Sequence, residues 1–398
     1  MNETEYDHDV VVAGGGPAGS TAATLLAQHG HRVLLLERDR HPRFHIGESM
    51  LPLSEPVVQR LGIDWSVGNQ FKSGAVFMDE ASQQSMYFPL SATRRAYQVE
   101  RAPFDQQLFE NAARHGVVVR QEEKVLEVAC EDDHVGIRSE RGHYRCRYLI
   151  DATGRSALMG RKQSGIDRIQ TLGRFAVYSH YSDIRPGEEA DELFRTGNIY
   201  VPVVDIGWIW IIPLSGRRLS VGLVVQKERP KDMDVENLFR HYVAQSSMLG
   251  RLLAGAQQDQ PIRTEADFSY TNQQRYGARY ACCGDAAGFL DPVFSSGVFL
   301  AFTSAARIAD RIHQGLSEGR EADPDLHRVD DQDYLLGFNT MRAFVERFYQ
   351  SDMVHHLFFE ADKHPAVRDQ VAQLLAGDLW SGGNPLQNSL LASNRLSA

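Results

Sequence analysis

Three glycines near the start of the chain have the spacing of a phosphate-binding turn. Gly14, Gly16 and Gly19 follow a valine-rich segment, residues 9–13, and precede a segment rich in alanine and leucine. The first glycine permits a tight turn, the second lets the backbone approach a pyrophosphate, and the third allows a helix to pack closely on a strand. The pyrophosphate would then lie at the positive end of the helix dipole. This pattern predicts the binding of a dinucleotide.

An acidic residue stands where such a site needs one. The second apolar segment, residues 33–36, ends at Glu37, about 20 residues after Gly16, which is the spacing of the acid that binds the ribose. The sequence predicts a strand over residues 9–13, a helix over 20–29 and a strand over 33–36. A glycine-rich turn without a ligand would not need the acid at the end of that strand.

Two tryptophans and one lysine further along the chain are also candidates for chemistry. Trp208 and Trp210 lie in the longest apolar run and, two residues apart on a strand, would point to one face. Lys72 precedes Gly74. A tryptophan pair at this spacing usually belongs to a core, and a lone lysine usually lies on the surface. Neither pattern alone indicates a function.

Three later segments resemble motifs of FAD-dependent monooxygenases. Residues 151–156, DATGRS, resemble the second motif of that class, and residues 284–288, GDAAG, resemble the third, whose aspartate is Asp285 here. Residues 99–101, ending at Arg101 and followed by Phe104 and Asp105, resemble the start of the helix beside the flavin. The resemblance implies FAD rather than NAD as the dinucleotide, with Asp285 at the ribityl chain.

The chain is more narrowly similar to the flavin-dependent halogenases. Residues 208–213 match the family pattern WxWxIP, and residues 289–297 match FxxPxxSxG. Residues 45–49, followed by Leu51 and a proline, fit the flavin-side loop, and Lys72 lies where the family carries its catalytic lysine. The resemblance extends over residues 9–312, and more loosely to residue 383.

This resemblance implies a mechanism and a set of site residues. FAD, as FADH2, and O2 would oxidise chloride or bromide to hypohalous acid, which Lys72 would hold by a hydrogen bond or as a haloamine. Trp208, Trp210 and Pro213 would wall off the flavin from the substrate, and the backbone N–H groups of Ser296 and Gly297 would bind the halide. The expected cofactor-binding residues are Gly14, Gly16, Ala18, Gly19, Glu37, Arg38, Glu48, Ser49, Arg101, Asp151, Gly154, Asp285, Gly288, Pro292 and Gly297.

One departure from the tryptophan-halogenating branch bears on the substrate. That branch carries a glutamate before the serine of FxxPxxSxG, and this chain carries Phe294. The resemblance therefore implies the branch that acts on phenols or pyrroles, some of them tethered to an acyl or peptidyl carrier protein. The alternatives are a flavin-dependent aromatic hydroxylase, a geranylgeranyl-type flavin reductase, or a non-catalytic FAD-binding protein. None of these needs Trp208, Trp210 and Lys72.

Composition limits the remaining function classes. Of 398 residues, 42% are apolar and 24% charged, which is ordinary for a globular protein with a buried core. The net charge of −10 argues against a nucleic-acid partner and, mildly, against docking of an acidic carrier protein. We expect neither a signal peptide nor a membrane span, and no disulfide framework or metal site from the four cysteines. A cytoplasmic enzyme is therefore expected. The absence of a second GxGxxG unit fits an enzyme that receives reduced flavin from a separate reductase, although single-component hydroxylases also lack such a unit.

The elements that must position these residues suggest an α/β (α+β) fold. We expect a Rossmann-like FAD-binding domain of the aromatic-hydroxylase type, an inserted antiparallel-sheet substrate subdomain, and C-terminal helices. The expected FAD-binding domain comprises residues 1–73, 97–170 and 265–330; the substrate subdomain 74–96 and 171–264; and the helical region 331–398. Helices are predicted over residues 102–115, 297–312, 331–359 and 365–376. The aromatic residues between 344 and 359 would be pocket walls or, more simply, helix packing.

Overall fold

Parallel strands form the centre of the first sheet. The computed structural model describes residues 6–91, 93–227, 233–266, 269–350 and 365–394. The strands of this sheet are β1 (His8–Ala13), β2 (Val33–Leu36), β7 (Val118–Arg120), β8 (Val125–Cys130), β9 (Val135–Ser139), β10 (His143–Asp151), β19 (Tyr276–Gly277) and β20 (Tyr280–Cys282). The order is β19-β20-β10-β1-β2-β7, with β9 beside β10 and β8 beside β9. From β20 to β7 all neighbours are parallel, so their carboxyl ends meet at one edge.

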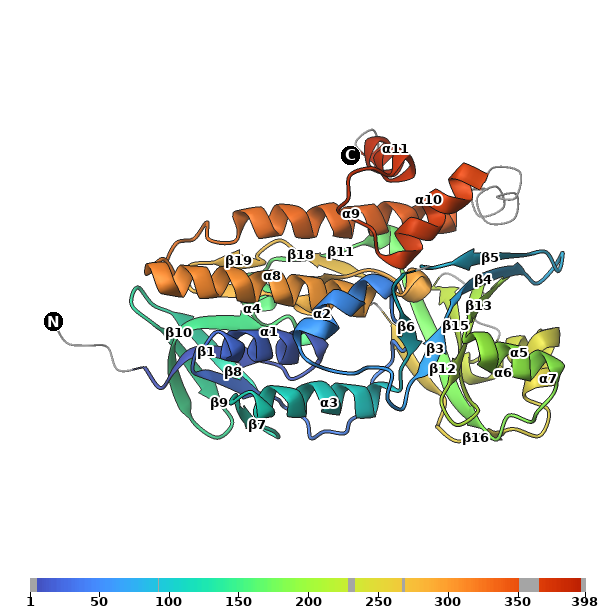
Figure 1. The fold of residues 1–398 in the computed structure, drawn as a ribbon, viewed down its shortest axis with the longest axis horizontal. Helices are drawn as coiled ribbons and strands as arrows, with labels where there is room; N and C mark the ends of the chain where they lie inside the picture. Colours follow the sequence, from blue (N-terminus) through green and yellow to red (C-terminus); the bar gives the residue numbers. More distant parts are fainter. Residues whose placement is uncertain (1–5, 92, 228–232, 267–268, 351–364, 395–398) are drawn as a thin grey trace.

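Both faces of this sheet are covered, which explains why β1 is apolar along its length. Val10 and Val12 face one cluster with the helices α1 (Pro17–Gln28), α3 (Arg101–Arg114) and α8 (Ser296–Glu318). Val11 and Ala13 face the opposite cluster. Figure 1 shows α1, α3 and α8 running along the sheet.

The second sheet is mainly antiparallel. Its strands are β4 (Gly74–Asp79), β5 (Ser85–Pro89), β12 (Arg174–Ser182), β13 (Ile199–Val204), β14 (Gly207–Leu214), β15 (Arg218–Gln226), β16 (Gln257–Gln258) and β17 (Arg263–Ala266). The order is β16-β12-β15-β14-β13-β4-β5, with β17 on β12 and only β13–β4 parallel. One face packs on α5 (Glu188–Thr196), α6 (Val235–Gln245) and α7 (Ser247–Leu252). The other face, which carries Trp208 and Trp210, belongs to the same core cluster as Val11.

Short elements and the C-terminal helices complete the described chain. The short strands are β3 (Gln70–Lys72) paired with β6 (Ala96–Gln98), and β11 (Ile166–Arg168), β18 (Tyr270–Asn272) and β21 (Gly288–Phe289) in a three-stranded sheet. The remaining helices are α2 (Glu55–Arg60), α4 (Leu158–Lys162), α9 (Arg328–Gln350), α10 (Pro365–Ala376) and α11 (Pro385–Asn394), with 3-10 turns η1 (Pro52–Ser54), η2 (Gly154–Ser156), η3 (Gln170–Leu172), η4 (Gly284–Ala286) and η5 (Pro292–Phe294). In Figure 1, α9 lies along α8, and α10 reaches β5.

The predicted helices differ from the observed ones mainly at their ends. The helix expected over residues 297–312 begins at Ser296 and continues to Glu318, and the one expected over 331–359 begins at Arg328. Residues 351–359 of that prediction, with Phe358 and Phe359, lie outside the described residues. The mixed α/β fold class is confirmed, whereas the predicted domain boundaries stay a prediction. No helix in the described ranges is long and apolar enough to cross a membrane.

Candidate active site

Four loops from four neighbouring strands meet at the carboxyl edge of the parallel sheet. Gly14 follows β1, Glu37 follows β2, Asp151 ends β10, and Gly284 stands two residues after the end of β20. In open α/β sheets, ligands bind at this edge because the loops and helix N-termini converge there. The sequence places these motifs far apart, and the strand order β20-β10-β1-β2 brings them together.

The three glycines of the first turn have separate roles. A Cβ on Gly14, whose φ is +106°, would lie 2.2 Å from the carbonyl oxygen of Ala152, and one on Gly19 would lie 1.8 Å from the carbonyl oxygen of Gly14. Gly16 differs, because its Cβ would approach only a guanidinium nitrogen of Arg43, at 3.4 Å. It is the N-cap of α1 and has no side chain to cap the helix. The fold therefore requires Gly14 and Gly19, whereas Gly16 leaves space at free N–H groups that fits a pyrophosphate.

The acid after β2 is buried and oriented by the backbone. One oxygen of Glu37, Oε2, accepts the N–H of Gly15 at 2.6 Å, and the other, Oε1, accepts the N–H of Asp39 at 2.9 Å. Arg38, in contrast, faces solvent and bonds to Asp39 and Ser156. Of these two predicted cofactor residues, only Glu37 has a fixed place at the sheet edge.

Residues of the second and third motifs mainly stabilise the loops that follow β10 and β20. The Asp151 carboxylate accepts hydrogen bonds from the N–H and hydroxyl of Thr153 and from the N–H of Met159, so it organises its own loop. Gly154 has φ +61° and open space where a Cβ would project. On the third loop, a Cβ on Gly284 would lie 2.9 Å from the Cβ of Ala18, so the first and third motifs touch.

Arg101 is buried at the start of α3 in a dense set of hydrogen bonds. Its Nε and Nη2 donate to both carboxylate oxygens of Asp105, at 2.8 and 3.0 Å. Its Nη1 donates to the carbonyls of Ile46 and Gly47 in the flavin-side loop. Burial acts to lower the pKa of Arg101, but the carboxylate of Asp105 outweighs burial and raises this pKa. The predicted arginine therefore fixes the loop that carries Glu48.

Glu48 and Ser49 follow in that loop with unused polar atoms. Glu48 Oε1 lies 2.8 Å from Nε2 of His180 on β12, and both side chains are 3% exposed. Glu48 Oε2 and the Ser49 hydroxyl are buried with no hydrogen-bond partner among the described residues. Buried polar atoms are normally paired, so these two suit a bound polar ligand such as the flavin.

The third motif and the predicted halide loop line one cavity. Its walls include Asp285, Gly288, Asp291, Ser296 and Gly297. Pro292 starts the turn η5, and the backbone then turns left-handed before α8 begins with free N–H groups at Ser296. Burial raises the pKa of Asp285 to about 6. The structure thus joins the predicted ribityl and halide residues in one space.

Lys72 is buried at the end of β3, apart from the residues that line this cavity. Its side chain is 3% exposed, and its Nζ donates to the carbonyl of Met50 at 3.0 Å. No ion pair to Lys72 occurs in the described chain. Burial lowers the pKa of Lys72 to about 7, because desolvation disfavours the charged ammonium. A substantial fraction of the amine is therefore neutral near pH 7.

The two tryptophans lie together on the inner face of β14, with ring centroids 6.0 Å apart. The Trp210 indole N–H donates to the Ser220 hydroxyl at 3.0 Å. A Cβ on Gly222 would lie 2.2 Å from the Trp210 ring, so this glycine lets the indole lie across β15. Pro213 is buried near the end of β14, opposite Leu219.

Several contacts at these sites were not predicted from the sequence. Asp105 belongs to the segment that resembles the helix beside the flavin, and its position four residues after Arg101 was a usable signal for their ion pair. No spacing pattern predicted the contact of His180 with Glu48, or those of the Tyr349 hydroxyl with Trp208 and Asp291. The partners in these contacts lie 58 to 141 residues apart in the chain.

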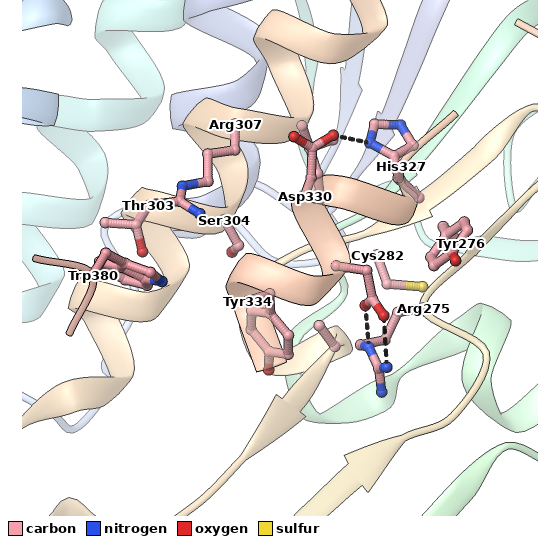
Figure 2. Close-up of a pocket in the computed structure, with 14 residues that line it drawn as sticks. Arg275, Tyr276, Cys282, Thr303, Ser304, Arg307, His327, Asp330, Tyr334 and Trp380 are labelled. Atoms are coloured by element: carbon pink, nitrogen blue, oxygen red, sulfur yellow. Dashed lines mark hydrogen bonds and ion pairs between the residues drawn. The ribbon is translucent and has the colours of Figure 1, made fainter. Parts of the chain in front are cut away.

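A second cavity lies between residues of α8, α9 and the segment 275–287 (Figure 2). His327 Nδ1 lies 3.2 Å from Asp330 Oδ2, and Arg275 donates to both carboxylate oxygens of Asp331. Tyr334 also lines it, with a hydroxyl that has no partner among the described residues. None of the predicted site residues lines this cavity. In the part of the chain that the structure describes, no group of His, Cys, Asp and Glu could hold a metal ion.

These features define a class: a dinucleotide-binding α/β fold whose cofactor edge faces an attached antiparallel sheet. The match to known proteins is narrower. The family model described as tryptophan halogenase matches residues 9–93 and 79–381. The chain belongs to the tryptophan halogenase family.

Individual relatives agree with this assignment. The chain is 26% identical to 1H-pyrrole-2-carbonyl-[peptidyl-carrier protein] chlorinase of Pseudomonas fluorescens, covering 95% of this chain and 91% of the relative. It is 29% identical to the corresponding brominase of Pseudoalteromonas luteoviolacea, covering 93% and 92%. The structure matches the flavin-dependent brominase Bmp2 with a TM-score of 0.87 at 25% identity, over 98% of both chains.

The enzyme is therefore a flavin-dependent halogenase, which uses FAD and a halide. The resemblance seen in the sequence is confirmed. The hydroxylase and geranylgeranyl reductase alternatives are not favoured.

Proposed function

We propose that the enzyme halogenates an electron-rich phenol or pyrrole, with Lys72 as the catalytic residue that delivers the halogen. The observation that carries this proposal is the burial of Lys72 with the Met50 carbonyl as its single hydrogen-bond partner among the described residues. A lysine in such a place is available as a neutral amine at working pH. A surface lysine or an ion-paired lysine would remain an ammonium.

The chain's own residues would divide the work between cofactor and halogen. Bound FAD in its reduced form supplies, with O2, the oxidising power that converts halide into hypohalous acid. The α1 N-terminus at Gly16 would bind the pyrophosphate, Glu37 a ribose hydroxyl, and Asp285 the ribityl chain. The N–H groups of Ser296 and Gly297 would bind the halide.

The Lys72 amine would then accept a hydrogen bond from hypohalous acid, or react with it to form a haloamine and water. In either form the halogen is electrophilic, and the ring loses a proton as its C–X bond forms. Trp208, Trp210 and Pro213 would keep the organic substrate away from the flavin. The acid also has to be contained, because hypohalous acid released from the site would attack any nearby nucleophile.

Phe294 and the relatives both bear on the substrate class. Phe294 is 2% exposed and stacks on Phe344, with ring centroids 4.1 Å apart. An apolar ring at this position neither polarises a weakly nucleophilic substrate nor pairs with a charge, so an activated ring is needed. Two relatives covered over more than 90% of their length act on a pyrrole carbonyl held by a peptidyl carrier protein. We therefore favour an acyl-tethered pyrrole or phenol as the substrate. We also propose that a separate reductase supplies the reduced flavin and that the enzyme is cytoplasmic.

The test supplies a flavin reductase, NADH, FAD, O2 and either bromide or chloride. Pyrrole-2-carbonyl and hydroxybenzoyl groups are offered both on a carrier protein and as free acids, and products are analysed by mass spectrometry. We expect halogenated products that require the reductase and the halide. Hydroxylated products alone, or direct oxidation of NADPH without the reductase, would overturn the proposal. Omission of the carrier protein tests the tethered form separately.

A further inference from the structure

A tyrosine near the end of the described part of α9 joins the tryptophan wall to the halide loop. The Trp208 indole N–H donates to the hydroxyl of Tyr349 at 2.7 Å. The same hydroxyl donates to the carboxylate of Asp291, with both carboxylate oxygens at 3.0 Å. These three residues come from β14, from the loop before η5 and from α9. One hydroxyl group therefore connects three elements that are distant in sequence.

The groups around Tyr349 are buried, and two of them, Asp291 and Arg174, are charged. Trp208 and Asp291 are 1% and 2% exposed, and Arg174 on β12 is 5% exposed. The Arg174 guanidinium carbon lies 3.4 Å from the centroid of the Tyr349 ring, a cation–π contact. The Asp291 carboxylate also accepts the N–H of Val293 at 3.0 Å. A buried carboxylate costs free energy unless donors compensate it, so Tyr349 stabilises Asp291 as well as connecting it.

Asp291 is placed where its position matters for the proposed halide site. It lines the same cavity as Ser296 and Gly297 and immediately precedes the turn η5 that leads into α8. Trp208, at the other side of the hydroxyl, lies beside Trp210. A shift of either partner would change how the wall and the halide loop face each other.

We propose that Tyr349 is a positioning residue that holds the Trp208 indole and the Asp291 turn in one arrangement, and so keeps hypohalous acid between the halide loop and the tryptophan wall. The proposal rests on the proposed function, because it takes Ser296 and Gly297 as the halide site. A phenylalanine at this position can neither accept from Trp208 nor donate to Asp291.

A change in pH response follows from the charges that face Asp291. Burial raises the pKa of Asp291 to about 6, while the Val293 N–H, Arg174 and the Tyr349 hydroxyl lower it. Without that hydroxyl the pKa rises further, so the carboxylate takes up its proton at a higher pH. A neutral Asp291 repels an incoming halide less than an anion does. Halide binding tightens as Asp291 takes up its proton. In Tyr349→Phe this tightening should therefore begin at a higher pH than in the wild type.

The experiment compares Tyr349→Phe with Tyr334→Phe in the FAD-loaded full chain. Tyr334 is a matched control, because it is a buried tyrosine on the same helix whose hydroxyl has no partner among the described residues. Two quantities are measured: bromide binding against pH, followed by flavin absorbance, and the share of oxidising equivalents that escapes as hypobromous acid. An amine such as taurine in solution traps the escaped acid.

For Tyr349→Phe we expect several-fold more trapped acid per turnover and a halide-binding midpoint that moves to higher pH, with FAD affinity unchanged. In an Asp291→Asn background the pH shift should vanish, because the titrating carboxylate is gone. Equal behaviour of the two tyrosine variants in both measurements would overturn the proposal, as would a pH shift that persists in the Asp291→Asn background. If the wild-type chain halogenates no probe, the proposed function fails, and the bromide-binding midpoint alone then decides the role of Tyr349.

Discussion

Arg101 and Lys72 are both buried cations, 4% and 3% exposed, but their surroundings are opposite in kind. Arg101 meets the carboxylate of Asp105 through two hydrogen bonds and two loop carbonyls through a third nitrogen. Lys72 meets the single carbonyl of Met50. Burial acts on both cations: it lowers the pKa of Lys72 to about 7, whereas at Arg101 the carboxylate of Asp105 outweighs it and raises the pKa.

The difference separates a structural charge from a reactive one. A guanidinium with a bidentate carboxylate keeps its charge and fixes the loop around it. An ammonium without a counter-charge loses its proton readily, and the resulting amine has a lone pair for chemistry. In this enzyme the cofactor side holds the compensated cation, and the proposed delivery site holds the uncompensated one.

The largest expected effect comes from replacing the reactive cation. Lys72→Ala should reduce halogenation about 1,000-fold or more, because it removes the amine that is proposed to hold the halogen. Lys72→Arg should fail as well, since a guanidinium does not deprotonate. Product formation under the reductase-coupled assay, together with FAD binding, gives the measurement.

FAD binding should persist in both variants, because Lys72 does not line the cavity of the third motif. A variant with alanine that halogenates at the wild-type rate would show that Lys72 is structural and would remove the contrast with Arg101.

The compensated cation should instead determine stability. Arg101→Met leaves the carboxylate of Asp105 buried, with the more distant Arg43, at 3.5 Å, as its remaining ion-pair partner among the described residues. Loss of one partner of a buried pair costs about 3–5 kcal/mol. Urea unfolding followed by circular dichroism, with FAD at a fixed concentration, should show this loss. The double variant Arg101→Met with Asp105→Leu should recover part of it; no recovery would mean that the loop carbonyls, rather than the ion pair, carry the effect.

The contrast also shows where sequence reasoning succeeds. The turn at Gly14, the helix after it and the strand that ends at Glu37 are local patterns, and about 30 residues contain every partner they need. Arg101 and Asp105 form a pair four residues apart on one helix, so helical spacing alone could predict it. The family motifs placed the cofactor loops in order, and the sheet then joined them.

The burial of Lys72 could not be predicted in the same way. In β3, which is only three residues long, the apolar neighbour Phe71 is 44% exposed while Lys72 is buried, the reverse of what their residue types predict. Its desolvation depends on β6 and on the loop at Met50, which the sequence places more than twenty residues away on either side. The role of Tyr349 is still harder to predict from the sequence, because its hydroxyl bonds to Trp208, which lies 141 residues away in the chain. Contacts of that range follow from packing and leave no local pattern.

The smallest expected effect concerns the free energy cost of burying the Lys72 ammonium, and the size of this cost depends on pH. The pKa of a lysine in the unfolded chain is near the ordinary value of 10.5, and that of Lys72 in the folded chain is about 7. Between these values the unfolded state binds a proton that the folded state has released, so the stability of the wild type rises with pH. Below pH 7 the full cost of the buried ammonium is present, and above pH 10.5 it is gone.

Lys72→Met keeps the volume of the side chain and removes this cost. The shift in pKa from 10.5 to about 7 corresponds to about 4–5 kcal/mol, and loss of the donor to the Met50 carbonyl offsets about 1 kcal/mol of this gain. We therefore expect Lys72→Met to be more stable than the wild type by about 3–4 kcal/mol at pH 6.5, with the difference falling to about zero near pH 10. Urea unfolding of both proteins at several pH values, at equal FAD concentration, measures the difference. Arg101→Met is the control, because an arginine stays protonated over this range and its effect should be nearly flat. A constant difference for Lys72→Met would mean that the ammonium is compensated in solution, and the contrast between the two cations would fail.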